Sequence, residues 1–223
     1  MYEELSYTFS VLSLIFYSIV YVPQFYVIYK NKSSDGISIW MLLLWTQADA
    51  LSLVGTIILN FNIQIILIGW YHFIVGVTMI LYTLVYDHYI NFLKITSVTT
   101  FISLNFILAI ILNITVNQPQ EILGATIGWV TMIIYIIGRF PQIYMNHDRK
   151  STEGLSILMY VLTILGNSCY IVVLTLDQSY LLANLPWLLS SIITILLDIF
   201  VILQYYNYRN NQKDANNFQK IDI

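Results

Sequence analysis

One carboxylate stands where a membrane-spanning helix rarely holds a charge. Asp49 lies near the middle of an apolar run over residues 37–59, and an ionised side chain at such a depth costs about 2.5–3.5 kcal/mol on insertion scales. The residue 118 positions later, Asn167, is a neutral amide inside another apolar run. A carboxylate and an amide at matching depth suit one small polar solute with an ammonium end, and the carboxylate also suits a proton. The alternatives are an Asp49 satisfied by neighbouring hydroxyls and an Asn167 that only joins helices.

Two further side chains belong to the same group of candidates. His72 lies in an apolar run over residues 64–86, and at 1.5 Å per residue its depth differs from that of Asp49 by roughly 3 Å. A histidine beside a carboxylate exchanges a proton in the pH range of an acidic lumen, whereas a bond from His72 to a backbone carbonyl is the alternative. Trp187 follows Pro186 and forms either a pocket wall or an aromatic anchor at the membrane interface.

An arginine and an aspartate lie inside two other apolar runs. Arg139 falls within residues 122–146 and Asp198 within residues 181–206, at similar distances from the same membrane face. An ion pair between them would compensate both charges. Such a pair serves either to hold the helices together or to open as a gate.

The dipeptide Pro-Gln occurs twice, as Pro23-Gln24 and Pro141-Gln142. Proline lacks a backbone donor and clashes with the carbonyl one turn earlier, so both positions predict a kink about two turns from a helix end. A kink repeated at matching positions indicates a hinge. We expect the glutamines to bond the carbonyls that the prolines leave free or to line a gate. The alternative is that membrane helices simply tolerate proline.

The elements that must position these residues follow from composition. Of the 223 residues, 58% are hydrophobic and 9% charged, with a mean hydropathy of +0.74, whereas about a quarter of a soluble domain is charged. The composition therefore predicts an all-α membrane protein. Apolar runs long enough to cross a bilayer predict seven spans, at residues 5–29, 37–59, 64–86, 94–116, 122–146, 154–176 and 181–206.

The basic residues predict the orientation of these spans. Eight of the nine lysines and arginines follow spans 1, 3, 5 and 7, and the ninth is Arg139 inside span 5. Because basic residues near span ends stay cytosolic, we expect the N-terminus on the luminal side and the C-terminus in the cytosol. The tail from Asn207 is rich in Asn, Gln and Lys and is predicted to be disordered.

An internal repeat organises the chain. At an offset of 118 residues, Lys32-Ser33-Ser34-Asp35-Gly36-Ile37-Ser38 aligns without a gap with Lys150-Ser151-Thr152-Glu153-Gly154-Leu155-Ser156. Each copy holds three spans, and span 4 between them restores the direction of the second copy, as in parallel-repeat transporters. The expected units are a first three-helix bundle (1–93), a linker helix (94–121), a second three-helix bundle (122–206) and a cytosolic tail (207–223).

These duplicated motifs carry a resemblance to a known family. Pro-Gln near the end of a span, followed by a short basic loop and Gly-x-Ser, resembles the PQ-loop repeat family. The second copy is most similar to lysosomal and vacuolar cationic amino-acid transporters, in Arg139-Phe140-Pro141-Gln142-Ile143, Leu165-Gly166-Asn167, Pro186-Trp187-Leu188 and Leu197-Asp198. The resemblance implies a carrier in a lysosomal or vacuolar membrane that exports arginine, lysine and histidine from an acidic lumen to the cytosol by alternating access.

Other functions fit the sequence less well. A cystine or small-sugar carrier of the same family is the serious alternative, and a seven-helix receptor is weakened by the repeat and the short loops. The sequence has no Gly-rich phosphate loop, no Ser-His-Asp arrangement and no metal-ligand spacing, so we expect neither an enzyme nor a cofactor. The expected partners are cationic amino acids, protons as a candidate coupling ion and membrane lipids, but not nucleic acid; oligomeric state is left open.

Overall fold

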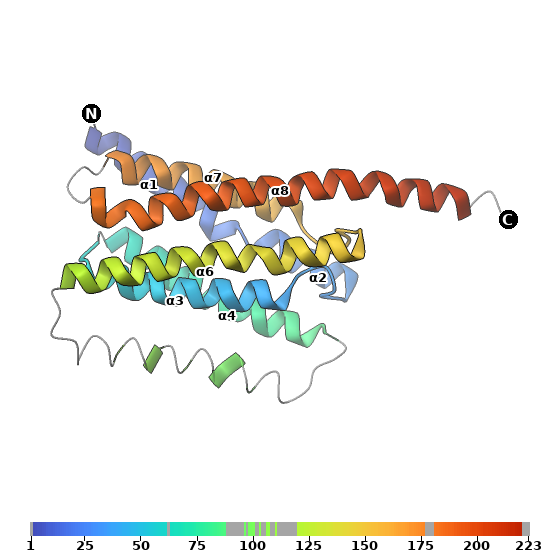
Figure 1. Cartoon of the computed structure of the whole chain (residues 1–223), viewed down its shortest axis with the longest axis horizontal. Coiled ribbons are helices and arrows are strands. Elements are labelled where there is room, and N and C mark those ends of the chain that lie inside the picture. Colours follow the sequence, from blue (N-terminus) through green and yellow to red (C-terminus); the bar gives the residue numbers. More distant parts are fainter. Residues whose placement is uncertain are drawn as a thin grey trace.

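The computed structural model describes residues 2–61, 63–87, 120–176 and 181–219, with isolated positions between 96 and 110. These residues contain no strand and form helices that lie along one long axis (Figure 1). The helices are α1 (Tyr2–Ile19), α2 (Val22–Asn31), α3 (Ile39–Ile58), α4 (Ile63–Val85), α6 (Gln120–Arg149), α7 (Ile157–Leu176) and α8 (Leu181–Gln219).

Six candidate membrane spans lie in the described residues, with α1 and α2 together making the first of them. The predicted all-α membrane architecture is thus confirmed, and helix ends fall close to the expected span limits except at the end of α8. The fourth predicted span, residues 94–116, lies outside the described residues apart from isolated positions.

The two copies of the repeat fold with the same boundaries. Helices α3 and α7 begin 118 residues apart, at Ile39 and Ile157, and also end 118 residues apart. The same spacing separates the starts of α4 and α8 and the ends of α2 and α6. Lys32 and Lys150, at matching positions, both adopt left-handed backbone conformations where the preceding helix ends. The repeat seen in the sequence is therefore also a repeat of local structure.

The two proline positions differ in local structure. In the first copy the chain breaks at Val20 and Tyr21, and Pro23 stands in the first turn of α2, where its missing N–H has no helical partner to lose. In the second copy α6 continues through Pro141. A kink is expected at both prolines: the chain breaks just before Pro23, and α6 continues through Pro141 without an interruption. Helix α6 is packed on α3 and α8, which supports it on both sides of the proline.

Packing joins the two copies rather than keeping them apart. Helix α1 packs mainly against α7, and its counterpart α6 packs against α3, so the first helix of each copy lies on the second helix of the other. Glycines allow close approach at these contacts: a Cβ at Gly166 of α7 would lie 2.7 Å from the ring of Tyr17 in α1. Such small residues are typical of helix contacts within membranes.

Helix α8 is longer than the expected last span. It extends from Leu181 to Gln219 and projects past the rest of the bundle in Figure 1, although the sequence predicts a disordered tail from Asn207. Residues 207–219 contain neither proline nor glycine, so nothing in the local sequence forces the helix to stop.

Candidate functional site

A cavity lies between the two repeats. Its wall includes at least one residue from each of six helices: Tyr17 of α1, Asp49 of α3, His72 of α4, Tyr135 of α6, Asn167 of α7 and Trp187 of α8. Four of the predicted site residues, Asp49, His72, Asn167 and Trp187, are therefore brought together. The cavity extends to Thr56 and Ile65, close to the helix ends that face away from the loops at residues 32–38 and 150–156.

Asp49 is the acidic residue of the cavity wall. Its side chain is 4% exposed, and the hydroxyl of Tyr135 donates a hydrogen bond to its Oδ1 at 2.5 Å. The Nδ1 atom of His72 lies 3.8 Å from the same oxygen. The similar depth predicted for Asp49 and His72 is thus observed. Among the described residues, the other ring nitrogen of His72, Nε2, is buried without a hydrogen-bond partner, so no backbone carbonyl of that part of the chain holds it.

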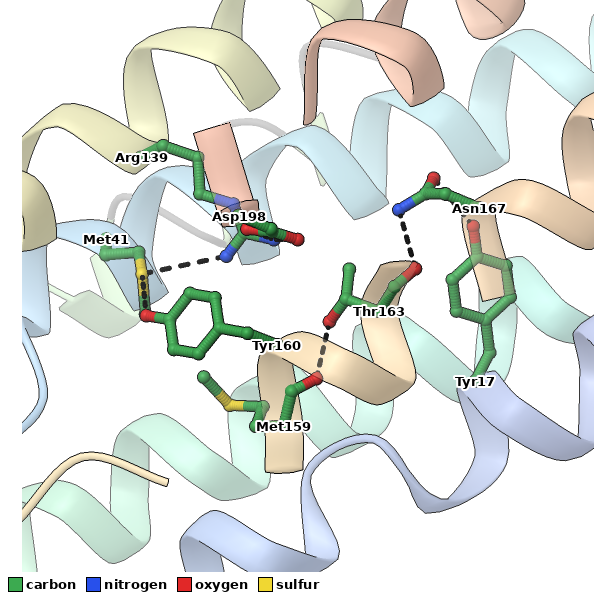
Figure 2. A network of polar contacts seen from close by, with 8 residues as sticks. All are labelled: Tyr17, Met41, Arg139, Met159, Tyr160, Thr163, Asn167 and Asp198. Carbon is green, nitrogen blue, oxygen red and sulfur yellow. Dashed lines mark hydrogen bonds and ion pairs between the residues drawn. The ribbon is translucent and has the colours of Figure 1, made fainter. Parts of the chain in front are cut away.

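Asn167 occupies the matching place in the second repeat. Its amide Oδ1 accepts a hydrogen bond from the hydroxyl of Tyr17 at 2.8 Å, and its Nδ2 donates to the carbonyl of Thr163 at 3.0 Å (Figure 2). The two tyrosines that serve Asp49 and Asn167 were not singled out by the sequence reasoning. They are themselves 118 residues apart, so extending the repeat alignment toward the N-terminus would have found them.

Trp187 lies inside the bundle, at the cavity wall. It is 5% exposed, and its Nε1 donates to the hydroxyl of Ser52 at 3.0 Å. Its ring lies against Gly128, where an added Cβ would approach within 2.6 Å of the ring. Of the two predicted roles, these contacts fit a pocket wall, since an anchor at the membrane interface keeps one edge in water.

Arg139 and Asp198 form an ion pair deep in the bundle. Nη2 of Arg139 lies 2.8 Å from both carboxylate oxygens of Asp198, and both side chains are 0% exposed. The guanidinium carbon is 3.3 Å from the centre of the Trp45 ring and 5.3 Å from that of Tyr160. Figure 2 shows this group beside Met41. Asp198 balances the charge of Arg139, and Asp49 is the one carboxylate among the described residues that line the cavity.

The two Pro-Gln glutamines tie the repeats together at the loop end. The amide of Gln24 donates to the carbonyl of Gly154 at 3.0 Å and accepts from the backbone N–H of Ser156 at 2.7 Å. Gln142 makes the equivalent bonds to the first repeat. It donates to the carbonyl of Gly36 at 3.1 Å and accepts from the N–H of Ser38 at 2.7 Å. These four bonds are called the glutamine brace below.

The brace uses partners that the sequence reasoning did not foresee. Both glutamines bond the loop of the opposite repeat rather than the carbonyls that the prolines leave free in their own helices. The two loops touch through backbone, since a Cβ on Gly36 would lie 2.0 Å from the carbonyl carbon of Gly154. Buried Met41 and Met159 fill the first turns of α3 and α7 behind them. The loop end of the cavity is therefore closed.

These features define what the site can do. The described residues hold no group of three or more potential metal ligands. The cavity offers one buried carboxylate beside a histidine, together with neutral amide and hydroxyl groups on the facing repeat. Such a lining has the chemistry to accommodate a small solute that carries a positive charge and polar groups.

Comparisons with known proteins agree with this arrangement. The family model described as the PQ loop repeat matches residues 5–65 and 123–183. The "Lysosomal amino acid transporter 1 homolog" of Homo sapiens is 26% identical over 252 residues, which cover 94% of this chain and 84% of the relative. The "Vacuolar lysine transporter YPQ1" of Saccharomyces cerevisiae is 23% identical over 278 residues, covering 87% of this chain and 90% of the relative.

A shorter match and a solved structure add to these findings. The "Vacuolar histidine transporter YPQ3" of the same yeast is 38% identical over 93 residues, or 42% of this chain and 27% of the relative. A eukaryotic SWEET transporter, solved at 3.7 Å resolution, superposes with a TM-score of 0.66, covering 94% of this chain and 99% of that one at 13% identity. At that identity the likeness concerns the fold alone.

Proposed function

Because this chain belongs to the PQ-loop repeat family, we propose that it is a membrane transporter of cationic amino acids. It exports arginine, lysine and histidine from an acidic organelle lumen to the cytosol by alternating access. The names of its relatives support the amino-acid class, since they are described as transporters of amino acids, of lysine and of histidine. The same names support a place in a lysosomal or vacuolar membrane.

The observation that carries the proposal is the buried carboxylate in the cavity. Asp49 and its neutral repeat mate Asn167 line the same cavity between the repeats. A carboxylate at this depth is costly when it is unpaired, and a cationic side chain is the partner that removes the cost. The substrate then lies with its cation toward Asp49 and with its remaining polar atoms toward Asn167, Ser190 and Ser191 of the second repeat.

The conformation described here is proposed to be the lumen-facing one. The loops at residues 32–38 and 150–156 carry basic residues, which favours the cytosolic side for the end that the glutamine brace closes. Export then requires the brace to open as the opposite end closes, with Pro23 and Pro141 as hinges. A tag placed before Met1 should be protected from cytosolic protease and one after Ile223 should be cut; the reverse pattern would contradict this orientation.

Transport by the purified protein tests the substrate class. Liposomes with an acidic interior are loaded in parallel with labelled arginine, lysine, histidine, cystine, a neutral amino acid or a small sugar. The proposal predicts that the three cationic amino acids leave faster than from protein-free liposomes, while the others do not. Release of cystine or sugar alone would overturn the cationic assignment. Saturable binding without release of any solute would instead favour a receptor.

A further inference from the structure

Two tyrosines link the repeats across the cavity in the same way. Tyr17, on the first helix of the first repeat, donates to Asn167 on the second helix of the other repeat. Tyr135, its counterpart 118 residues later, donates to Asp49, the counterpart of Asn167. The hydrogen bonds are therefore equivalent in geometry but not in chemistry, because one acceptor is a neutral amide and the other a carboxylate. A donor on a charged acceptor contributes more than one on a neutral acceptor.

The hydrogen bond from Tyr135 makes the two carboxylate oxygens of Asp49 differ in their contacts. Oδ1 accepts from Tyr135 and has Nδ1 of His72 3.8 Å away. Within the described part of the chain, Oδ2 takes part in no hydrogen bond or ion pair. With Oδ1 held by a residue from the opposite repeat, the carboxylate has one orientation and presents its second oxygen as the vacant acceptor.

We propose that Tyr135 is the positioning residue for cation recognition: it holds Asp49 so that Oδ2 receives the substrate's ammonium or guanidinium group. Tyr135 contacts the substrate's charge only through Asp49. This inference rests on the proposed function, because it takes a cationic amino acid as the solute. Tyr17 has the corresponding place beside a neutral acceptor, so it influences binding of the substrate without selecting its charge.

Three single variants separate this role from a merely structural one. Tyr135→Phe and Tyr17→Phe each remove one hydroxyl from a cavity tyrosine. Tyr71→Phe is the matched control, since the Tyr71 hydroxyl donates to the backbone carbonyl of Ser18 and Tyr71 does not line the cavity. Transport of labelled arginine and lysine is measured in liposomes over a concentration series, so that KM and kcat are obtained separately.

We expect Tyr135→Phe to raise the KM for arginine and lysine by about tenfold, which is the scale of one hydrogen bond to a charged group, with kcat little changed. Tyr17→Phe should raise these KM values less, and Tyr71→Phe should leave them unchanged. Thermal unfolding in detergent checks that each variant is folded. A Tyr135→Phe protein that is folded and keeps the wild-type KM would overturn the positioning role.

The double variant Asp49→Asn/Tyr135→Phe tests whether Tyr135 acts through Asp49. If it does, the double variant has the same KM as Asp49→Asn alone, because the orientation of a missing carboxylate has no further effect. Multiplied effects of the two substitutions would overturn the proposal. The wild-type protein separates failure of the proposed function from failure of this inference. A wild type that carries no cationic amino acid defeats the proposed function. A wild type that carries them, together with a Tyr135→Phe protein of unchanged KM, defeats only the positioning role.

Discussion

The first and second repeats set their helices at one spacing, yet they bring different side chains to matching places. Asp49 and His72 of the first repeat correspond to Asn167 and Ser190 of the second, and all four line the cavity. The glutamine brace, by contrast, is the same in both directions. The duplication thus retains the contacts that close the cavity and varies the groups that line it.

The buried ion pair belongs to the second repeat alone. The residues 118 positions before Arg139 and Asp198 are Tyr21 and Ile80, which are buried members of the hydrophobic core. One fold therefore accepts either an ion pair or an apolar pair at this place. Because an apolar pair of similar size often replaces a buried ion pair at no cost, exchanging the charged pair for the apolar pair of the first repeat tests what the charges do.

The largest expected effect concerns this pair. Arg139→Ala leaves the carboxylate of Asp198 buried and uncompensated, which should lower the free energy of unfolding by about 3–5 kcal/mol. The double variant Arg139→Tyr/Asp198→Ile copies the first repeat and should regain most of that loss. Thermal and denaturant unfolding in detergent measure both. An Arg139→Ala protein as stable as wild type would show that the pair contributes nothing to holding the bundle.

Transport by the double variant then separates the two roles predicted for the pair. If the variant is stable and transports normally, Arg139 and Asp198 are structural. If it is stable but inactive, the charges themselves are needed during the conformational cycle, as a gate requires.

The next effect concerns the symmetry of the brace. Gln142→Ala removes the acceptor of the Ser38 N–H, and Gln24→Ala removes the acceptor of the Ser156 N–H. At about 1 kcal/mol per hydrogen bond, losing the two bonds to the opposite loop should speed amide hydrogen exchange in that loop by tenfold or more. Exchange measured on peptides should rise mainly in the loop of the repeat opposite the substitution. A rise confined to the substituted repeat would contradict the crossed arrangement.

The smallest effect on stability concerns the prolines, where substitution by alanine should destabilise the protein at one position and stabilise it at the other. Pro23 starts α2, so Pro23→Ala gives up a favourable helix start and should destabilise this conformation by up to about 1 kcal/mol. Pro141 lies inside α6, where alanine restores a backbone donor and should stabilise the conformation. Unfolding temperatures measure both. If Pro141 is a hinge, transport by Pro141→Ala should be slow, because the restored backbone hydrogen bond stiffens α6. Unfolding temperatures that shift equally and in the same direction for both variants would mean that the helix break before Pro23 makes no difference to the effect of the proline.

Sequence reasoning reached the fold and part of the site. Apolar run lengths predicted the six described spans, and the gapless repeat predicted that both halves would share boundaries. The pairing of Asp49 with His72 and of Arg139 with Asp198 was predicted from depth alone. Polar residues at one depth in neighbouring helices have few other polar partners. The expected roles of these residues stay predictions.

What depended on the packing of one repeat against the other was missed. The partners of Gln24 and Gln142 lie in the opposite repeat, and depth does not reveal which loop a side chain meets. Tyr17 and Tyr135 were hidden among 18 tyrosines, most of which would suit an interface or a core equally well. Helix α6 continues through Pro141 and packs on α3 and α8, an environment that the local sequence does not specify.

The most direct test is arginine transport by the Asp49→Asn protein. It shows whether the carboxylate of Asp49, which the second repeat lacks at the matching position, selects cationic solutes. The substitution keeps the shape and a hydrogen-bonding group at this place but removes the charge, and a neutral amide costs less to bury, so the protein should fold. Loss of a solvent-shielded ion pair with the substrate should cost a few kcal/mol, which corresponds to transport of arginine and lysine reduced by roughly a hundredfold or more. Arginine transport equal to that of wild type, in a folded Asp49→Asn protein, would contradict the assignment of Asp49 as the cation site.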